Sequence, residues 1–269
     1  MSILTARRPG SAGPAEIQDT YVRPLVVAHR GFSHVAPENT LPALQQAVRV
    51  GADLVEIDVQ RTRDGQLVAL HDRSLRRTTD IARVWPHRTE DPLESFTLCE
   101  VQALDAGSWK GSGHTGTTIP TLVQVLDFLE GTGVGLLLEL KEPSRFPGIE
   151  RDIAQLLGHH PMGRRRRVTV QSFDTDALRR FGRLEPKIQR GVLTKTVPLR
   201  PSLLAWAAAV NPWHGAITAS YVRRAKLAGV DTFGWTVNSV SDISRLWATG
   251  VDAIITDRPD VALRTIDSG

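Results

Sequence analysis

Three carboxylates and a lysine in this sequence have a spacing that suits a buried, charged site. Glu56 and Asp58 stand two residues apart in the run "LVEIDV", and Glu139 stands two residues before Lys141 in "VGLLLELK". Because alternate side chains of a β-strand share one face, Glu56 and Asp58 point to the same side of their strand. Burying both anions without a counter-charge is costly, so we expect a cation beside them.

The chemistry of the three carboxylates indicates which cation would fit. An all-oxygen site built from two strands suits Mg²⁺ or Ca²⁺ better than Zn²⁺, and the sequence does not choose between the first two. The alternative is a salt-bridge network in which Lys141 pairs with Glu139 and the neighbouring acids. Two histidines at strand ends favour the metal site over that network.

These histidines, His29 and His71, each follow a short apolar run, in "LVVAHRG" and "QLVALHD". The catalytic side chains of a closed α/β barrel lie at the carboxyl ends of its strands. If the chain turns back at Asp64 and Gly65, His71 falls roughly opposite Asp58. Imidazole titrates near neutral pH, so one ring could accept a proton while the other donates one.

The apolar runs that carry these residues recur along the chain. We predict strands at residues 25–28, 54–59, 67–70, 134–140, 168–172, 188–193, 232–237 and 253–256, with a weaker one near 208–211. Amphipathic stretches at residues 40–50, 174–184, 241–249 and 259–265 follow four of them. This alternation predicts an α/β protein with a TIM-type (β/α)8 barrel. An open dinucleotide-binding sheet is disfavoured, because no Gly-x-Gly-x-x-Gly motif follows the first strand.

Two segments depart from the alternation. Only seven residues separate Val59 from Leu67, too few for a parallel crossover, so we predict a hairpin there. From about residue 73 to about residue 118 no strand is expected, and Gly, Ser and His gather in "GSWKGSGHTGTT". We predict a small, partly helical insertion over residues 73–118.

The composition is that of a globular protein. Of 269 residues, 41% are hydrophobic and 23% are charged, with a net charge of +4, which is ordinary for a globular enzyme. The run "RRRR" at residues 164–167 is interpreted as a solvated segment, and we expect no nucleic-acid partner. Cys99 is the only cysteine, so no disulfide can form within the chain, which fits a reducing compartment.

The ends of the chain bear on location. Residues 1–24 lack the apolar core of a signal peptide, so we predict a flexible tail there and the barrel over residues 25–269. No apolar stretch is long enough to span a bilayer. We therefore expect a soluble, cytoplasmic protein without stable membrane insertion, while export by an unusual route and the oligomeric state stay open.

Several motifs together resemble one enzyme family over nearly the whole chain from residue 25 onward. In order, they are "VAHRGFSHVAPENT", "VEIDVQRTRDGQLVALHD", "LDAGSWKG", "IPTL", "LELK", "VQSFD", "GWTVN" and "VDAIITDRPD". Their order and spacing are similar to those of the glycerophosphodiester phosphodiesterase family. The resemblance implies a TIM-type barrel with a small insertion after the His-Asp pair. It also implies a divalent-metal enzyme that cuts glycerophosphodiesters, its small-molecule substrates, to glycerol 3-phosphate and an alcohol.

The resemblance also implies roles for individual residues, and no implied position is replaced. These are the metal ligands Glu56, Asp58 and Glu139, the acid/base pair His29 and His71, and the phosphate-binding Arg30 and Lys141. Which histidine is the acid and which the base is not assigned. Glu38 and Asn39 in "PENT" are expected to orient Arg30 and to cap the helix that begins near Thr40. Trp235 either forms an apolar wall for the glycerol or packs in the core.

The other histidines have no partner pattern and are expected at the surface: His34, His87, His114, His159, His160 and His214.

Two other functions are kept as alternatives. A lysophospholipase D would use the same chemistry but would need an exposed apolar groove, for which the only candidates are Trp85, Phe96 and Trp109 in the insertion. A non-catalytic barrel that serves as a binding protein would be expected to have lost a ligand or a histidine, and none is lost. Small water-soluble substrates are favoured, because aromatic residues are only 6% of the chain and no amphipathic stretch has a clear basic face.

Overall fold

The computed structural model describes residues 23–164, 167–199, 204 and 206–268 of the chain. Within these residues, nine strands form one sheet in the order β1-β9-β8-β7-β6-β5-β4-β2-β3, and β1 also pairs with β2. The pairing of β1 with β2 closes the sheet, and every pairing around the ring is parallel. The described strands other than β3, eight in number, therefore form a closed parallel barrel. The predicted TIM-type fold is confirmed.

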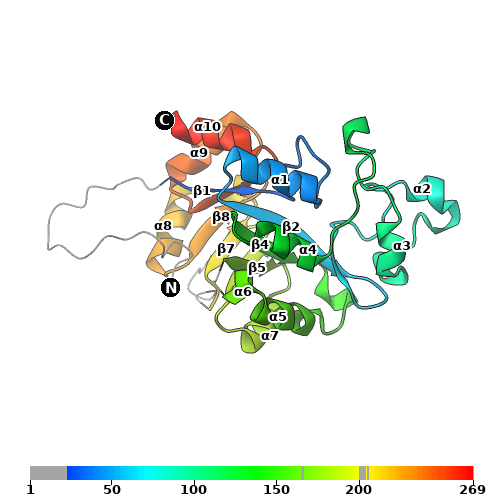
Figure 1. Cartoon of the computed structure of the whole chain (residues 1–269). Coiled ribbons are helices and arrows are strands. Elements are labelled where there is room, and N and C mark those ends of the chain that lie inside the picture. The colour runs from blue at the N-terminus through cyan, green and yellow to red at the C-terminus, as the bar shows by residue number, and fades with distance from the viewer. Residues whose placement is uncertain (1–22, 165–166, 200–203, 205, 269) are drawn as a thin grey trace, which may run out of the picture.

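The strands of the barrel lie inside a layer of helices (Figure 1). The strands are β1 (Leu25–Ala28), β2 (Leu54–Arg61), β4 (Gly135–Leu140), β5 (Val168–Ser172), β6 (Gln189–Thr194), β7 (Ala209–Pro212), β8 (Asp231–Gly234) and β9 (Ala253–Thr256). The surrounding helices are α1 (Leu41–Val50), α4 (Leu122–Leu129), α5 (Ile149–His159), α6 (Pro161–Arg164), α7 (Thr175–Leu184), α8 (Ala219–Leu227), α9 (Val240–Thr249) and α10 (Pro259–Asp267). Every residue of β5, β7, β8 and β9 is buried, as expected for strands covered on both faces.

Local capping explains where several helices begin and end. The Asp174 carboxylate accepts a hydrogen bond from the backbone N–H of Ala177 at the start of α7, and Ser239 does the same for Asp242 at the start of α9. Such bonds satisfy N–H groups that have no partner within the helix. At the end of α9, Gly250 takes a left-handed conformation (φ 78°) that favours glycine.

Alternation along β2 sends successive side chains to opposite sides of the barrel wall. Ile57 packs outward, in a cluster that includes residues of α1 and α4. Leu54 points the other way and packs with Leu137 of β4 in a second cluster. Glu56 and Asp58 share the face of Leu54, because they are two and four residues further along the strand. The inner face of β2 is therefore apolar near its start and acidic toward its carboxyl end.

Strand β3 (Leu67–Ala69) extends β2 as the predicted hairpin. The pairing is antiparallel, with Arg61 opposite Leu67 and Val59 opposite Ala69, and Gly65 takes a positive φ of 84° in the turn. The Leu70 N–H donates to the carbonyl oxygen of Asp58 at 2.9 Å. The chain that follows β3 therefore runs beside the acidic end of β2.

The segment between β3 and α4 has short helical elements and buried residues of its own. The elements are α2 (Ile81–Val84), η1 (Pro86–Arg88), η2 (Leu93–Ser95), α3 (Leu98–Gln102) and η3 (Ser112–His114). Leu75, Ile81 and Phe96 are fully buried in one cluster. Figure 1 shows α2 and α3 beyond the end of β2, away from the helices that surround the barrel. An ion pair between Glu94 of this segment and Arg145 of η4 (Pro143–Arg145) ties it to the barrel.

A few sequence expectations differ from the structure or lie outside it. Strand β8 ends at Gly234, three residues before the predicted end, and Trp235 begins the loop that follows. Residues 1–22 of the predicted tail and residues 165–166 of the arginine run lie outside the described residues. Arg23, the first described residue, is held by Asp53, with two N–O distances of 2.8 Å.

Across the described ranges, the helices are too short or too polar to cross a bilayer.

Candidate active site

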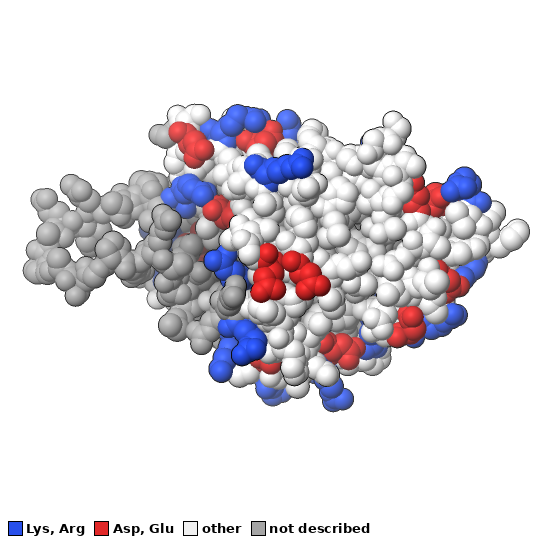
Figure 2. Space-filling view, in the orientation of Figure 1, with Lys and Arg blue, Asp and Glu red and all other residues white. Residues whose placement is uncertain are grey.

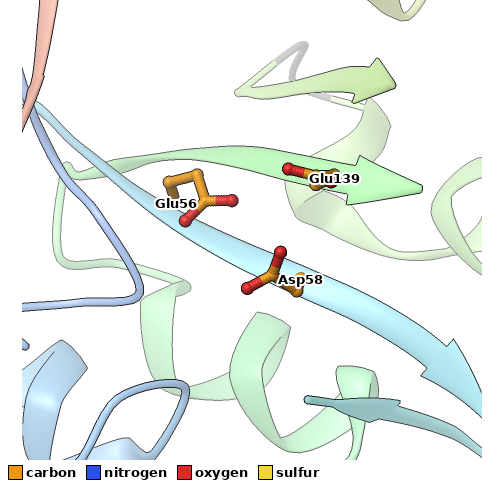
Figure 3. A group of neighbouring side chains, drawn as sticks. All are labelled: Glu56, Asp58 and Glu139. Atoms are coloured by element: carbon orange, nitrogen blue, oxygen red, sulfur yellow. The ribbon is translucent and has the colours of Figure 1, made fainter. Parts of the chain in front are cut away.

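Glu56, Asp58 and Glu139 form one buried cluster at the carboxyl ends of β2 and β4. Asp58 pairs with Glu139 across the two strands, and one carboxylate oxygen of each of the three residues lies within 4.8 Å of the others. Their exposed fractions are 1%, 1% and 7%. Figure 3 shows the three side chains on the same side of the two strands. The geometry brings together the three ligands predicted from the sequence.

Two basic side chains lie against these carboxylates. Arg30 Nε is 3.1 Å from Asp58 Oδ2, and Lys141 Nζ is 3.1 Å from Glu139 Oε1 and 3.5 Å from Asp58 Oδ1. The backbone N–H of Arg30 donates to Glu56 Oε2 at 2.9 Å. The salt-bridge network that the sequence offered as an alternative is therefore present. It supplies two positive charges for three carboxylates.

The excess of negative over positive charge affects the pKa values of the three carboxylates. Burial disfavours an ionised Asp58, but the charges of Arg30 and Lys141 outweigh it and lower the pKa of Asp58 to about 2. Burial and the Asp58 charge raise the pKa of Glu139 to about 7. Burial, then Asp58 and Glu139, raises the pKa of Glu56 well above its usual value. A divalent cation would relieve this repulsion, and three carboxylate oxygens are the donors that Mg²⁺ and Ca²⁺ prefer, so the residues fit such an ion.

The metal-free protein is expected to lose thermal stability as the pH rises from about 5 to about 7. Folded Glu139 keeps its proton up to about pH 7, whereas the unfolded chain releases it near 4.5. The folded state therefore binds more protons in this window, so the free energy of unfolding falls as the pH rises. Thermal melts across the window check this. Saturating Mg²⁺ should flatten the slope, and the Glu139→Gln variant should reduce it, while Glu56 still contributes a slope of the same sign. A flat profile for the metal-free parent would contradict the prediction.

His29 and His71 each have a carboxylate partner on Nδ1. His29 Nδ1 lies 2.6 Å from Asp257 Oδ1, and His71 Nδ1 lies 2.6 Å from Asp72 Oδ1. Burial opposes ionisation of Asp257, but its hydrogen bond and charge contact with His29 dominate and lower its pKa to about 2. An ionised carboxylate only accepts hydrogen bonds, so Nδ1 of each ring carries the donated proton. Nε2 of each ring is then the atom that can exchange a proton.

The surroundings of the two histidines differ. Burial lowers the pKa of His71, the Asp58 charge opposes this, and the Arg30 charge adds to it. His71 is thus electrostatically coupled to the carboxylate cluster. His29 follows β1, which pairs with β2, and its neighbour Arg30 contacts Glu56 and Asp58.

Glu38 and Asn39 have different roles in the structure. Glu38 Oε1 accepts a hydrogen bond from Arg30 Nη1 at 2.7 Å, as expected from the sequence. The expectation that Asn39 caps the next helix is wrong. Its side chain is buried and turned toward β2, where it donates to Asp58 Oδ2 at 3.0 Å and accepts the Asp58 N–H at 3.1 Å. Thr40 occupies the N-cap position, without a side-chain capping bond.

Trp235 lies at the barrel mouth beside a second aromatic residue. Its indole Nε1 donates to the carbonyl oxygen of Asn211 at 2.6 Å, and its ring packs edge-to-face with Phe173 at 5.7 Å between centroids. A cavity of about 420 Å³ is lined by Phe173 and Ser172 at the end of β5 and by Glu139 and Lys141 at the end of β4. The cavity therefore lies between Glu139 of the carboxylate cluster and Phe173. Phe173 and Trp235 together form an aromatic wall beside it.

The expectation that the remaining histidines lie at the surface is wrong for two of them. The side chains of His160 and His214 are only 10% and 18% exposed. Each is engaged in a polar contact: His160 Nδ1 accepts the Met162 N–H at 3.2 Å, and His214 Nδ1 lies 3.2 Å from Arg245 Nη2. Polar contacts that follow from the tertiary fold explain why these two rings are partly buried although the sequence shows no partner pattern for them.

Comparison with known proteins identifies the family. The sequence model of the glycerophosphoryl diester phosphodiesterase family matches residues 29–261, which is most of the chain. The chain belongs to this family. A glycerophosphodiester phosphodiesterase of Caldanaerobacter subterraneus subsp. tengcongensis is 34% identical over 252 residues, covering 92% of this chain and 100% of that protein. One from Bacillus subtilis is 31% identical over 258 residues, covering 89% of this chain and 85% of that protein.

Solved structures agree with this membership. A phosphodiesterase of Oleispira antarctica, solved with its product sn-glycerol-3-phosphate, has a TM-score of 0.80 and 33% identity, covering 91% of this chain and 97% of that one. The relatives are glycerophosphodiester phosphodiesterases, so the chain is a phosphoric diester hydrolase of the glycerophosphoryl diester phosphodiesterase family.

The structure of this family member also shows polar partners that the sequence reasoning missed. Asp257 and Asp72 hold the two histidines, and neither was assigned a role. Asp72 directly follows His71, and Asp257 directly follows β9, so both stand at strand ends, where a functional carboxylate could have been suspected. Asn238 Nδ2 donates to Asp257 Oδ2 at 2.6 Å, a contact for which the sequence has no local signal.

Proposed function

We propose that the chain hydrolyses glycerophosphodiesters to glycerol 3-phosphate and an alcohol, with His29 and His71 as the acid/base pair. The observation that carries this proposal is the pair of histidines whose Nδ1 atoms are fixed by carboxylates, at the barrel end that holds the buried carboxylate cluster. Two rings that are held at Nδ1 and can exchange a proton at Nε2, beside carboxylates that fit a cation, are what displacement at a phosphodiester requires.

Glu56, Asp58 and Glu139 would hold one Mg²⁺ or Ca²⁺ ion. When bound, the ion would supply positive charge to the non-bridging oxygens of the phosphate. Arg30 and Lys141 both lie against Asp58, so their cationic groups would bind the phosphate beside the cluster. Charges fixed in place before the reaction stabilise the growing negative charge without reorganisation.

The histidines would move the protons. Nε2 of one ring accepts the proton of the nucleophile, which is either water or the glycerol hydroxyl next to the phosphate. The new phosphorus–oxygen bond forms as the bond to the leaving alcohol breaks, and Nε2–H of the other ring protonates the leaving oxygen. If the glycerol hydroxyl attacks, water then opens the cyclic phosphate with the two rings in exchanged roles.

Recognition of the glycerol is assigned to the aromatic wall and the cavity beside it. Trp235 and Phe173 would pack against the carbon atoms of glycerol, while polar groups near the cluster bind its hydroxyls. The cavity of about 420 Å³ is of a size that suits a glycerol phosphate rather than a long acyl chain.

The aromatic residues of the insertion offer little exposed surface for the apolar groove that a lysophospholipase D would need. Phe96 is fully buried, and Trp85 stacks on it at 6.2 Å between ring centroids. Of the three aromatic residues suggested by the sequence, only Trp109 is exposed, at 39%. A lysophospholipid substrate is nevertheless kept as the second candidate, because Phe173 and Trp213 directly follow β5 and β7 and are 46% and 48% exposed.

The two candidates differ in substrate preference. We expect glycerophosphocholine, glycerophosphoethanolamine and glycerophosphoglycerol all to be cleaved, because the leaving alcohol would point toward the barrel mouth and would make few specific contacts. The measurement is kcat/KM for these diesters, for bis(p-nitrophenyl) phosphate and for a lysophosphatidylcholine. A lysolipid preferred by about tenfold or more would reverse the choice between the two candidates.

The organisation of the whole chain follows the same proposal. We infer a catalytic barrel over residues 25–269 with a small insertion at about residues 73–118. We expect a cytoplasmic enzyme with a small-molecule substrate and no nucleic-acid partner. In support, Figure 2 shows Lys and Arg interspersed with Asp and Glu on the face drawn there, without one large basic patch.

A further inference from the structure

Arg77, in the inserted segment, forms ion pairs with two carboxylates at once. Its Nη1 and Nη2 atoms each lie 2.7 Å from an oxygen of Glu38. Its Nε lies 2.5 Å from Asp72 Oδ2, and Nη2 lies 3.1 Å from Asp72 Oδ1. A planar guanidinium has five N–H donors in a fixed fork, so it can bridge two carboxylates in one geometry.

Each of these carboxylates also binds a residue of the proposed mechanism. Glu38 Oε1 accepts a hydrogen bond from Arg30 Nη1 at 2.7 Å, and Asp72 Oδ1 accepts one from His71 Nδ1 at 2.6 Å. The chain of contacts therefore runs from His71 through Asp72 and Arg77 to Glu38 and Arg30. It joins a proton-transfer group to a phosphate-binding group.

The backbone that carries Arg77 is well anchored. Leu75, Thr78 and Thr79 are 0%, 5% and 8% exposed. Thr79 Oγ1 donates to the Leu75 carbonyl oxygen at 2.6 Å and accepts the Ile81 N–H at 3.2 Å. Leu75 and Ile81 belong to the buried cluster of the inserted segment. The side chain of Arg77 extends from this anchored backbone to Glu38 and Asp72, so the packing of the inserted segment sets where the guanidinium lies.

We propose that Arg77 is a positioning residue for the reaction of the barrel. Its fork holds Glu38 and Asp72 in one arrangement, which in turn fixes the guanidinium of Arg30 and the ring of His71. This inference rests on the proposed function, because it assumes that those two groups act on the phosphodiester. It gives the inserted segment a part in catalysis without contact with the substrate.

The kinetic test compares three variants with the parent enzyme. Arg77→Gln is expected to lower kcat by about 10- to 100-fold, the range for groups that orient catalytic residues, with KM changed less than kcat. Arg77→Lys keeps the positive charge, but an ammonium group cannot hold both carboxylates in the same geometry. We therefore expect Arg77→Lys to lower kcat by nearly as much as Arg77→Gln. Arg76→Gln is the matched control, because Arg76 pairs with Glu90 and both side chains are well exposed, at 65% and 71%. It should keep full activity.

Three kinetic results would overturn the proposal. Folded Arg77→Gln protein with a kcat within about threefold of the parent would show that the fork is dispensable. Full activity in Arg77→Lys would show that charge alone suffices. The third test adds Arg77→Gln to a protein that already carries Glu38→Gln and Asp72→Asn, where the proposal predicts a further change in kcat of less than about twofold. A further fall in kcat as large as that of Arg77→Gln alone would mean that Arg77 acts by another route.

A measurement independent of turnover separates this inference from the proposed function. Ring-carbon shifts of histidine-labelled protein report the tautomer of His71, whose signals are assigned by their loss in His71→Ala. The parent should show the Nδ1–H tautomer at a pH where the ring is neutral, and Arg77→Gln should shift it toward a mixture. An unchanged tautomer in Arg77→Gln would contradict the positioning role. If the parent cleaves no glycerophosphodiester but the tautomer shifts, the proposed function fails while the contact chain stands.

Discussion

Replacement of His29 or His71 by alanine is expected to lower kcat by at least ~100-fold while leaving the protein folded, because each change removes one group that transfers a proton. The geometry supports a separate role for each ring, since each has its own carboxylate on Nδ1 and, among the described residues, no hydrogen bond at Nε2. Both rings stand in loops at strand ends and are partly exposed, at 20% and 29%. Their loss therefore leaves no cavity in the core.

The control for the histidine variants is His159→Ala. His159 lies on α5, is exposed, and contacts the carbonyl oxygen of Gln155 within its own helix, so its loss should leave kcat unchanged. Thermal melts and kcat are measured together on each protein. Near-normal turnover in either folded active-site variant would rule out the assigned acid/base pair.

The second large effect is expected when the divalent cation is removed. Exhaustive chelation should abolish hydrolysis and Mg²⁺ or Ca²⁺ should restore it, because the ion would supply positive charge to the phosphate oxygens. The raised pKa values of Glu56 and Glu139 indicate that the buried cluster lacks such a charge without the ion. Glu56→Gln, Asp58→Asn and Glu139→Gln preserve shape and remove charge. Each should weaken metal affinity by at least ~10-fold, since even groups that only orient metal ligands contribute that much.

Metal affinity and kinetics together test the ion's role. Calorimetric titration gives the affinity, and kcat at saturating metal shows whether a ligand variant recovers. Glu90→Gln is a suitable control, because Glu90 is an exposed carboxylate in a single ion pair with Arg76. Full activity of demetallated protein would exclude the cation from the reaction.

The fold could be predicted because its signals are local. Strands such as β1, β5 and β9 have the predicted bounds, since each is a short apolar run that the barrel buries on both sides. The hairpin between β2 and β3 followed from the short connection and its Asp-Gly turn. Strand β8 was predicted too long, because apolar residues continue past Gly234 into the loop that holds Trp235.

The metal-binding candidates could also be predicted from local pattern. Glu56 and Asp58 share a face by strand alternation alone, and Glu139 closes another apolar run. Their proximity, however, depends on which strands pair. Asp58 lies beside Glu139 because β2 and β4 are neighbours in the closed barrel, although β3 and the whole insertion separate them along the chain.

The strand-end histidines, the acidic face of β2 and the barrel that carries them could be predicted from the amino-acid pattern, because strand periodicity and chain order are local properties. The partners that orient those groups are known only from the folded chain. Asp257 reaches His29 across 228 positions of the chain, and Arg77 reaches Glu38 across 39. Asn39 turned to Asp58 rather than to its own helix. Such contacts depend on barrel closure and on the path of loops, and hydrogen bonds between distant side chains have no period that a sequence can display.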